Sequence, residues 1–406
     1  MAPRGAAADR TGRRREGGRV APRILIVAGE RSGDQHGADF VRAVLARAPQ
    51  VRFFGVGGPN MRAAGVETRW DATALAVIGL REGLGKLPLL WRTFRAVLRA
   101  ARRGSVEAAV LIDYPGFNLR LAERLRGCGV PVVYYIAPQV WAWRPQRLRR
   151  MTRCVDEVLV ILPFEPPSFE AAGMHATFVG HPTLDALRHT PPREVARRQL
   201  GVPAAATVIG LAPGSRAQEV TTLLPRFLEA AALLAARHPE LRFLLPLAGG
   251  ELRPLAQRLI SRHRLPVQLE LGRTPEVFRA CDVLLVASGT ATLEAGILGT
   301  PMVIAYRVRP STYWLARRLV RVRWIGLVNL IAGEGIVPEL VQHACTAPRL
   351  AAAVGALLPG SPAALEQRRR LAAMAARLGG PGAAGRAAQA FLAFLEGAAT
   401  RPTAAR

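Results

Sequence analysis

Residues 283–301 read Val-Leu-Leu-Val-Ala-Ser-Gly-Thr-Ala-Thr-Leu-Glu-Ala-Gly-Ile-Leu-Gly-Thr-Pro, and this stretch decides the fold. An unbroken apolar run ends at small hydroxylated residues, and a helix-compatible segment then runs to Gly299, just before Pro301. This pattern predicts a buried parallel strand, a tight turn and the start of a helix. A helix N-terminus has unpaired N–H groups and a partial positive charge, which favour a bound anion. The stretch is therefore a candidate ligand site.

The candidate ligand-binding residues of this turn are small or acidic. Small side chains let a ligand approach the backbone, and a carboxylate one turn into the helix could accept hydrogen bonds from ligand hydroxyls. An ordinary turn with N-cap residues and a surface glutamate is the alternative. The candidates are Ser288, Gly289, Thr290, Ala291, Thr292 and Glu294.

Strands alternate with helices on both sides of a proline-marked segment at residues 188–206. This alternation predicts an α/β protein with two facing Rossmann-like domains, each built on a parallel sheet. We expect the first domain at residues 23–187 and the second at 188–350. Residues 1–22 are predicted to be a disordered basic extension. Residues 351–406 are predicted to form C-terminal helices with a disordered tail.

Charge and composition narrow the classes of partner. The chain of 406 residues has a formal net charge of +27, which implies attraction to polyanions. No nucleic-acid-binding motif is present, so nucleic acid is not an expected partner. The four cysteines are scattered, which argues against disulfides and a zinc site. No apolar run approaches the ~18 residues of a membrane span.

Two stretches, residues 77–103 and 311–325, mix arginines with leucine, tryptophan and other apolar residues. Such a mixture is typical of helices that lie in a membrane interface, where the arginines contact lipid phosphates. An ordinary amphipathic helix packed on a sheet has the same pattern.

The usual nucleotide signatures are absent, because neither G-x-G-x-x-G nor a P-loop occurs at the right place. Gly214, Ser215 and Arg216 follow a predicted strand and offer loop N–H groups and a guanidinium to a diphosphate. Asp113 ends another predicted strand and is a candidate general base. Glu30 and His36 lie on loops or helix starts of the same half and are further catalytic candidates. The sequence contains no metal-binding motif, and no cofactor is expected.

Eight motifs occur in a fixed order along the chain. They are Ala28-Gly29-Glu30-x-Ser32-Gly33-Asp34-x-His36-Gly37, Asn118-Leu119-Arg120-Leu121-Ala122, Tyr134-Tyr135-x-x-Pro138-Gln139-Val140-Trp141-Ala142-Trp143-Arg144, Leu162-Pro163-Phe164-Glu165, Gly180-His181-Pro182, Pro213-Gly214-Ser215-Arg216, Ala287-Ser288-Gly289-Thr290-Ala291-Thr292-Leu293-Glu294 and Pro338-Glu339-Leu340. This set resembles lipid-A-disaccharide synthases, a family of inverting glycosyltransferases with the GT-B fold. The resemblance covers about residues 24–350.

The resemblance implies an activity and partners. UDP-2,3-diacylglucosamine would be the donor and 2,3-diacylglucosamine 1-phosphate the acceptor. The products would be the β-1,6 disaccharide 1-phosphate of lipid A biosynthesis and UDP. It further implies a C-terminal segment that crosses back to the first domain. The implied location is the cytoplasmic face of the inner membrane, so an anionic membrane surface is an expected partner. The sequence does not decide the oligomeric state, and a homodimer stays open.

The resemblance also implies roles for individual residues. Asp113 would take the proton of the acceptor 6-hydroxyl, Arg216 would stabilise the departing diphosphate, and Glu294 would hold the ribose. Asn329 matches a motif near the donor. Gly116 stands where the family usually has a second aspartate, so Glu30 or His36 would have to act if that aspartate were the base.

Two rival functions remain at this point. A UDP-sugar 2-epimerase of the same fold would keep the nucleotide site but act on one substrate. A basic nucleotide- or RNA-binding protein would have no turnover and would bind with a steep salt dependence.

Overall fold

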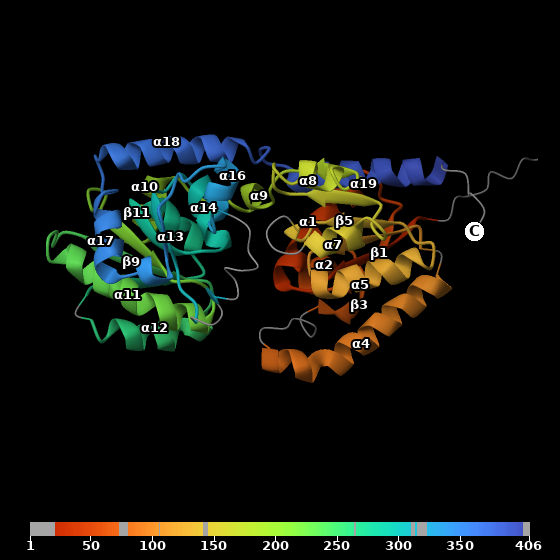
Figure 1. The fold of residues 1–406 in the computed structure, drawn as a ribbon, viewed down its shortest axis with the longest axis horizontal. Helices are drawn as coiled ribbons and strands as arrows, with labels where there is room; N and C mark the ends of the chain where they lie inside the picture. Colours follow the sequence, from red (N-terminus) through yellow and green to blue (C-terminus); the bar gives the residue numbers. More distant parts are fainter. Residues whose placement is uncertain are drawn as a thin grey trace, which may run out of the picture.

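The structure is a computed structural model that describes residues 21–72, 80–104, 106–140, 145–263, 265–309, 313–314 and 323–400. Two parallel sheets, each flanked by helices, form two lobes that lie side by side (Figure 1). This arrangement confirms the α/β prediction of two Rossmann-like domains. Some of the predictions lie outside the described residues. They concern most of the basic extension (1–20), parts of the two cationic stretches (77–79, 311–312 and 315–322), the end of the tryptophan-containing motif (141–144) and the end of the predicted disordered tail (401–406).

The first sheet has seven parallel strands in the order β3-β2-β1-β4-β5-β6-β7. Its central strands are uninterrupted apolar runs, as expected for strands covered by helices on both faces. The strands are β1 (Arg23–Ala28), β2 (Arg52–Gly57), β3 (Glu67–Asp71), β4 (Ala108–Ile112), β5 (Val132–Tyr135), β6 (Glu157–Val160) and β7 (Ala176–Phe178).

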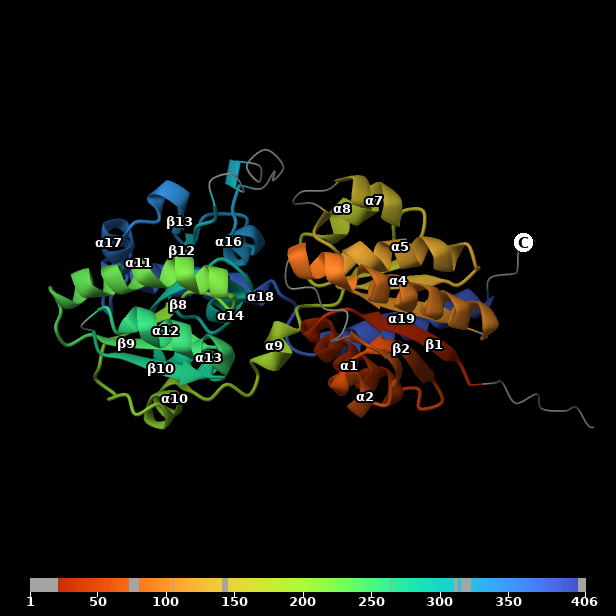
Figure 2. The ribbon, with the colours of Figure 1, turned by 90° about the horizontal axis from the view of Figure 1, so that it is seen from below.

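Helices follow most of these strands. They are α1 (Arg31–Leu45), α2 (Pro59–Ala63), α4 (Leu80–Arg103), α5 (Pro115–Arg126), α7 (Pro145–Met151), α8 (Pro166–Glu170) and α9 (Thr183–Ala186), the last of which lies between the two lobes (Figure 2).

The second sheet has six parallel strands in the order β10-β9-β8-β11-β12-β13. Its strands are β8 (Val208–Ala212), β9 (Arg242–Leu247), β10 (Val267–Leu271), β11 (Val283–Ala287), β12 (Met302–Tyr306) and β13 (Glu339–Val341). Its helices are α10 (Arg193–Gln199), α11 (Ala217–Ala235), α12 (Arg253–Ile260), α13 (Thr274–Ala280), α14 (Thr290–Ile297), α16 (Leu327–Ala332) and α17 (Ala347–Gly355), with single 3₁₀ turns at Gly250–Leu252 and Gln342–Ala344.

Both sheets reverse their strand order at one point, between β1 and β4 in the first and between β8 and β11 in the second. In open α/β sheets such a switch point leaves a crevice beyond the carboxyl ends of the strands, and ligands bind there. The fold therefore provides two equivalent places for a site.

The C-terminal segment crosses from the second lobe to the first, as the fold prediction expected (Figure 1). Helix α18 (Pro362–Ala376) packs on α14 and α16, and α19 (Ala383–Thr400) packs on α1. At the crossing, the Asp185 carboxylate accepts hydrogen bonds from the amides of Gly382 at 2.6 Å and Ala383 at 3.0 Å. The C-terminal helices thus divide between the two domains.

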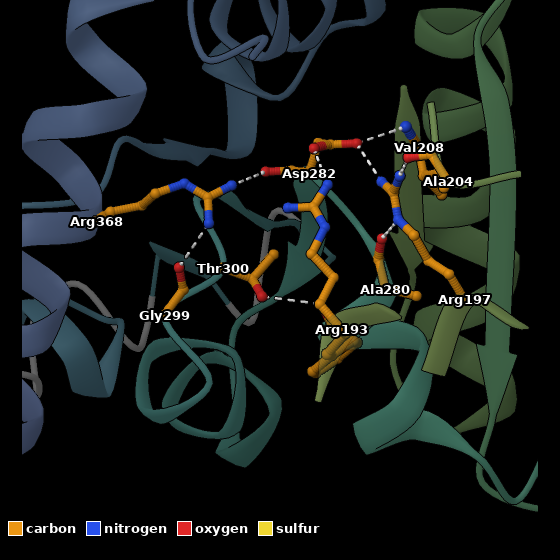
Figure 3. Close-up of polar contacts among 10 residues, drawn as sticks. Arg193, Arg197, Ala204, Val208, Ala280, Asp282, Gly299, Thr300 and Arg368 are labelled. Carbon is orange, nitrogen blue, oxygen red and sulfur yellow. Dashed lines mark hydrogen bonds and ion pairs between the residues drawn. The ribbon is translucent and has the colours of Figure 1, made fainter. Parts of the chain in front are cut away.

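A buried ion cluster ties the helices of the second domain to its sheet (Figure 3). The Asp282 carboxylate, just before β11, pairs with Arg193 and, at 2.8 Å, with Arg197, both on α10. It also accepts the amide of Val208 at 2.9 Å. The Asp282 and Arg197 side chains are 6% and 5% exposed, so both charges depend on each other for solvation.

Candidate functional site

A cavity of about 490 Å³ lies at the switch point of the second sheet. Its volume is in the range typical of small-ligand sites. It is lined from the carboxyl ends of β8, β9 and β11 and from the start of α14. The predicted residues among its lining are Gly214, Ser215, Arg216, Ser288, Gly289, Thr290, Ala291 and Glu294.

The start of α14 presents anion-binding groups to this cavity. The amides of Thr290 and Ala291 have no acceptor among the residues that the structure describes, as expected for the first turn of a helix. Glu294 lines the cavity, and burial raises the pKa of its carboxyl. Its carboxylate has no partner within the described part of the chain, so it could accept hydrogen bonds from a ligand hydroxyl.

Two of the predicted binding residues do not line the cavity. Thr292 is fully buried and its hydroxyl donates to the Gly289 carbonyl at 2.8 Å. Asn329 is fully buried in α16, where its amide donates to the Val337 carbonyl at 2.9 Å and to Glu339 at 2.8 Å. These hydrogen bonds hold the loops around the site, and the predicted ligand contacts of Thr292 and Asn329 stay predictions.

The loop at residues 214–216 differs from the prediction in one respect. The Glu219 carboxylate accepts the amides of Ser215 at 3.0 Å and Arg216 at 3.2 Å. This is a capping-box arrangement, in which an acidic residue in the first helical turn binds the loop amides. Two of the loop N–H groups that were assigned to a diphosphate, those of Ser215 and Arg216, therefore donate to Glu219. The exposed Arg216 guanidinium remains the cation of the cavity, 3.5 Å from Glu219.

If the cavity is the UDP site that the sequence resemblance implies, replacing Arg216 by alanine raises the Kd for UDP about ten- to a hundredfold, because hydrogen bonds to charged groups contribute about 1.5–3 kcal/mol. Isothermal titration with UDP measures this change. Arg242→Ala is the matched control, because Arg242 is an exposed arginine at the opposite, amino end of β9. Equal Kd values for the two variants would remove Arg216 from the nucleotide site.

Asp113 lies at the switch point of the first sheet, directly after β4. Burial, and secondarily the charge of Glu30, raise the pKa of Asp113 to about 6. A base with a pKa near neutrality combines a populated carboxylate with a useful proton affinity. The backbone of Asp113 and of Tyr114 is left-handed, with φ of 45° and 48°, and such strained conformations cluster at functional sites.

A second cavity of about 240 Å³ lies beside Asp113. Asp113 and Arg147 line it together with residues 136–139, which follow β5. Leu162, which follows β6 and lines the same cavity, belongs to one apolar cluster with Leu293 of α14. The carboxyl edge of the first sheet is thereby held against the second domain.

The other two catalytic candidates lie at different places along α1, and only one of them lies near Asp113. Glu30 is exposed at the N-cap of α1 and close enough to Asp113 to affect its pKa. His36 lies one turn further along α1, where burial lowers the pKa of its imidazole. It neighbours His181, whose pKa is lowered to about 4 by burial and secondarily by His36. Of these two residues, only Glu30 contributes to the raised pKa of Asp113.

Gly116, at the position of the family's second aspartate, is exposed near the start of α5. A Cβ added there would meet no atom within 4 Å. The missing side chain therefore leaves the packing around Asp113 unchanged.

Two carboxylates that hold loops of the two domains, Asp34 and Glu219, escaped the sequence reasoning. The buried Asp34 carboxylate accepts the amides of Gly58 at 2.6 Å, Asn60 at 3.0 Å and Met61 at 3.0 Å, so it caps α2. Its place in the first glycine-rich motif gave no sign of this long-range contact. The role of Glu219 could have been found, because an acidic residue three positions after Arg216 fits the capping-box spacing.

None of the helices that the structure describes is both long and apolar enough to cross a membrane. Within the described ranges, no three His, Cys, Asp or Glu side chains cluster as metal ligands would.

Two parallel-sheet domains, with a nucleotide-sized cavity at one switch point and a half-buried acid at the other, define a two-domain α/β protein of the GT-B type. Solved structures share the fold. A putative UDP-N-acetylglucosamine 2-epimerase from Listeria monocytogenes matches with a TM-score of 0.61 and 13% identity, covering 92% of this chain and 95% of that one. A UDP-GlcNAc 2-epimerase from Neisseria meningitidis matches with a TM-score of 0.57 and 12% identity, covering 92% and 100%.

The family follows from the sequence comparisons. The model of the lipid-A-disaccharide synthetase family matches residues 24–390. The lipid-A-disaccharide synthase of Geobacter sulfurreducens is 43% identical over 377 residues, which cover 92% of this chain and 97% of that protein. That of Myxococcus xanthus is 43% identical over 376 residues, covering 92% and 98%. The chain belongs to the lipid-A-disaccharide synthase family.

Proposed function

We propose that the protein transfers a 2,3-diacylglucosamine unit from UDP to the 6-hydroxyl of 2,3-diacylglucosamine 1-phosphate. One observation carries the proposal: an aspartate with a raised pKa, Asp113, lies at one switch point, and a nucleotide-sized cavity lies at the other. Membership of the lipid-A-disaccharide synthase family supports the identity of both substrates.

In the second domain, UDP would lie in the cavity of about 490 Å³. The diphosphate would meet the free amides at the start of α14 and the Arg216 guanidinium, and the ribose hydroxyls would donate to Glu294. These groups favour the extra negative charge that develops on the leaving diphosphate.

In the first domain, the Asp113 carboxylate would accept the proton of the acceptor 6-hydroxyl. The hydroxyl oxygen then forms a bond to the anomeric carbon of the donor. The bond from that carbon to the diphosphate oxygen breaks, and its electron pair leaves on UDP. This single displacement inverts the anomeric configuration and produces the β-1,6 linkage. For transfer, the two domains must hold the oxygen and carbon within reacting distance.

Product analysis tests the proposal. Purified protein is incubated with UDP-2,3-diacylglucosamine, with and without the 1-phosphate acceptor. We expect UDP and disaccharide 1-phosphate in equal amounts, and neither product without acceptor. Conversion of the donor to its 2-epimer without acceptor would favour the epimerase, whose fold the solved structures share. Failure of both reactions, with RNA binding that weakens steeply with salt, would favour the non-catalytic alternative.

We further propose that α4 binds the anionic, cytoplasmic face of the inner membrane. The side chains of Leu87, Leu89 and Trp91 are 54%, 41% and 56% exposed. Large apolar side chains that are exposed together on one helix segment often mark a site of interaction with a partner or a membrane. The Arg95 guanidinium lies 3.5 Å from the centroid of the Trp91 ring. The other face of α4 packs on the sheet through Val97 and its neighbours. Apolar and cationic side chains together suit a lipid surface.

The double variant Leu87→Ser, Trp91→Ser is expected to lose most binding to anionic vesicles, because burial of each side chain contributes about 1.5–3 kcal/mol. Co-sedimentation with vesicles containing phosphatidylglycerol measures the loss. The control is Leu233→Ser with Leu365→Ser, two leucines of the second domain that are 44% and 64% exposed. Equal sedimentation of both double variants would contradict membrane docking by α4.

A further inference from the structure

The backbone at Asp113 has an unusual conformation that needs an explanation. Its φ of 45° is followed by a φ of 48° at Tyr114, and L-residues rarely adopt this left-handed region. Ordinary helix or strand hydrogen bonds do not favour two such residues in a row. Specific contacts must therefore hold the turn.

The Asp113 carbonyl receives these contacts. The Tyr134 hydroxyl donates to it at 2.6 Å, and the Asn118 side-chain amide donates at 2.8 Å. The same Asn118 amide donates to the Ile112 carbonyl at 3.1 Å. The Asp113 amide stays in the sheet and donates to the Tyr135 carbonyl at 3.1 Å. With its amide held by the sheet and its carbonyl held by two side chains, the Asp113 backbone has little freedom.

Both donors are fully buried, which makes their positions rigid. Tyr134 comes from β5 and Asn118 from α5, so the Asp113 carbonyl is fixed from two elements. The Oδ1 atom of Asn118 is buried with no partner in the described part of the chain. An unpaired buried acceptor costs stability, so Asn118 is not optimal for folding alone.

Glycine at position 29 completes the arrangement. A Cβ added there would lie 2.1 Å from the Tyr114 ring, so only glycine lets Tyr114 pack against the end of β1. The Asp113 carbonyl is turned toward Tyr134 and Asn118, and Asp113 lines the cavity of about 240 Å³.

We propose that Tyr134 and Asn118 are positioning residues that aim the Asp113 carboxylate at the acceptor hydroxyl. They act through the Asp113 backbone and need not touch a substrate. The inference rests on the proposed role of Asp113 as base. Loss of either donor would let the turn relax and move the carboxylate, and small misplacements of reacting groups have large effects on rate.

The test is Tyr134→Phe, with Tyr135→Phe as matched control. Tyr135 is the next residue of β5, equally buried, but its ring packs on the opposite face, 5.7 Å from the Phe40 ring. Both variants lose one buried hydroxyl. We expect Tyr134→Phe to lower kcat about ten- to a hundredfold, with KM for the donor and Kd for UDP unchanged. Tyr135→Phe should keep kcat within about twofold. Equal loss in both variants would overturn the proposal.

A double variant separates positioning from a general structural effect. On the Asp113→Asn background, Tyr134→Phe should cause no further loss of the residual rate, because the group that it positions is already gone. Losses that multiply would contradict the proposal. Asn118→Ala is the second variant if Tyr134→Phe does not fold, and it should show the same split between kcat and KM. A wild type without acceptor-dependent turnover refutes the proposed function, whereas a turnover insensitive to both variants refutes only this inference.

Discussion

Replacing Asp113 by asparagine is expected to lower kcat about a thousandfold while leaving the Kd for UDP unchanged. Asparagine has nearly the size of aspartate, and the donors from Tyr134 and Asn118 bind the backbone carbonyl, so the turn should persist. The amide cannot accept the proton of the acceptor hydroxyl. The nucleotide cavity belongs to the other sheet, so UDP binding should not depend on the substitution. Steady-state rates and isothermal titration with UDP measure the two quantities.

Asp39→Asn is the control, because Asp39 is a carboxylate of α1 whose side chain is 43% exposed and pairs with Arg42 at the surface. It should keep wild-type rates. The wild-type pH profile gives an independent check. Since the pKa of Asp113 is raised to about 6 and the carboxylate is the working form, kcat/KM should fall as pH drops below about 6 and level off above it. An Asp113→Asn variant with wild-type turnover would move the base to another residue.

The largest loss of stability is expected from Asp282→Asn. The substitution leaves the guanidinium of Arg197, 5% exposed, without its carboxylate partner. Breaking a buried ion pair by removing one partner costs about 3–5 kcal/mol of unfolding free energy. The hydrogen bond from Val208 and the pairing with Arg193 weaken at the same time (Figure 3). Urea denaturation of the wild type and the variant, followed by circular dichroism, measures the change.

Glu67→Gln is the control for this experiment, because Glu67 pairs with Arg69 at the surface and its side chain is 62% exposed. Exposed ion pairs contribute about 0–1 kcal/mol, so this variant should unfold near the wild-type midpoint. An Asp282→Asn variant as stable as Glu67→Gln would show that the buried cluster does not hold α10 to the sheet.

The central strands were predictable because burial on both faces requires unbroken apolar runs. Residues 283–287 were predicted as a strand and form β11 with the same limits. The edge strands β3, β7 and β13 gave no such signal. They have only five, three and three residues and are partly exposed. Their pairing depends on neighbouring strands far away in the sequence.

Residues of the candidate site that follow a predicted strand could be placed from the sequence. Residues whose positions depend on tertiary contacts could not. Asp113 and Glu294 follow predicted strands, so their places at the carboxyl edges could be inferred. Asn329 was assigned to the donor site through its motif, but the hydrogen bonds of its amide to Val337 and Glu339 have no local sequence pattern. Likewise, the long-range contact of Tyr134 with the Asp113 carbonyl has no local pattern.

Acceptor-dependent release of UDP, compared between 2,3-diacylglucosamine 1-phosphate and its 6-deoxy analogue, tests the central claim most directly. The claim is that a nucleotide sugar in the second domain reacts with an acceptor hydroxyl deprotonated by the first. It predicts release of UDP with the acceptor, none with the 6-deoxy analogue, and none with Asp113→Asn protein. Equal release of UDP with both compounds would contradict the account.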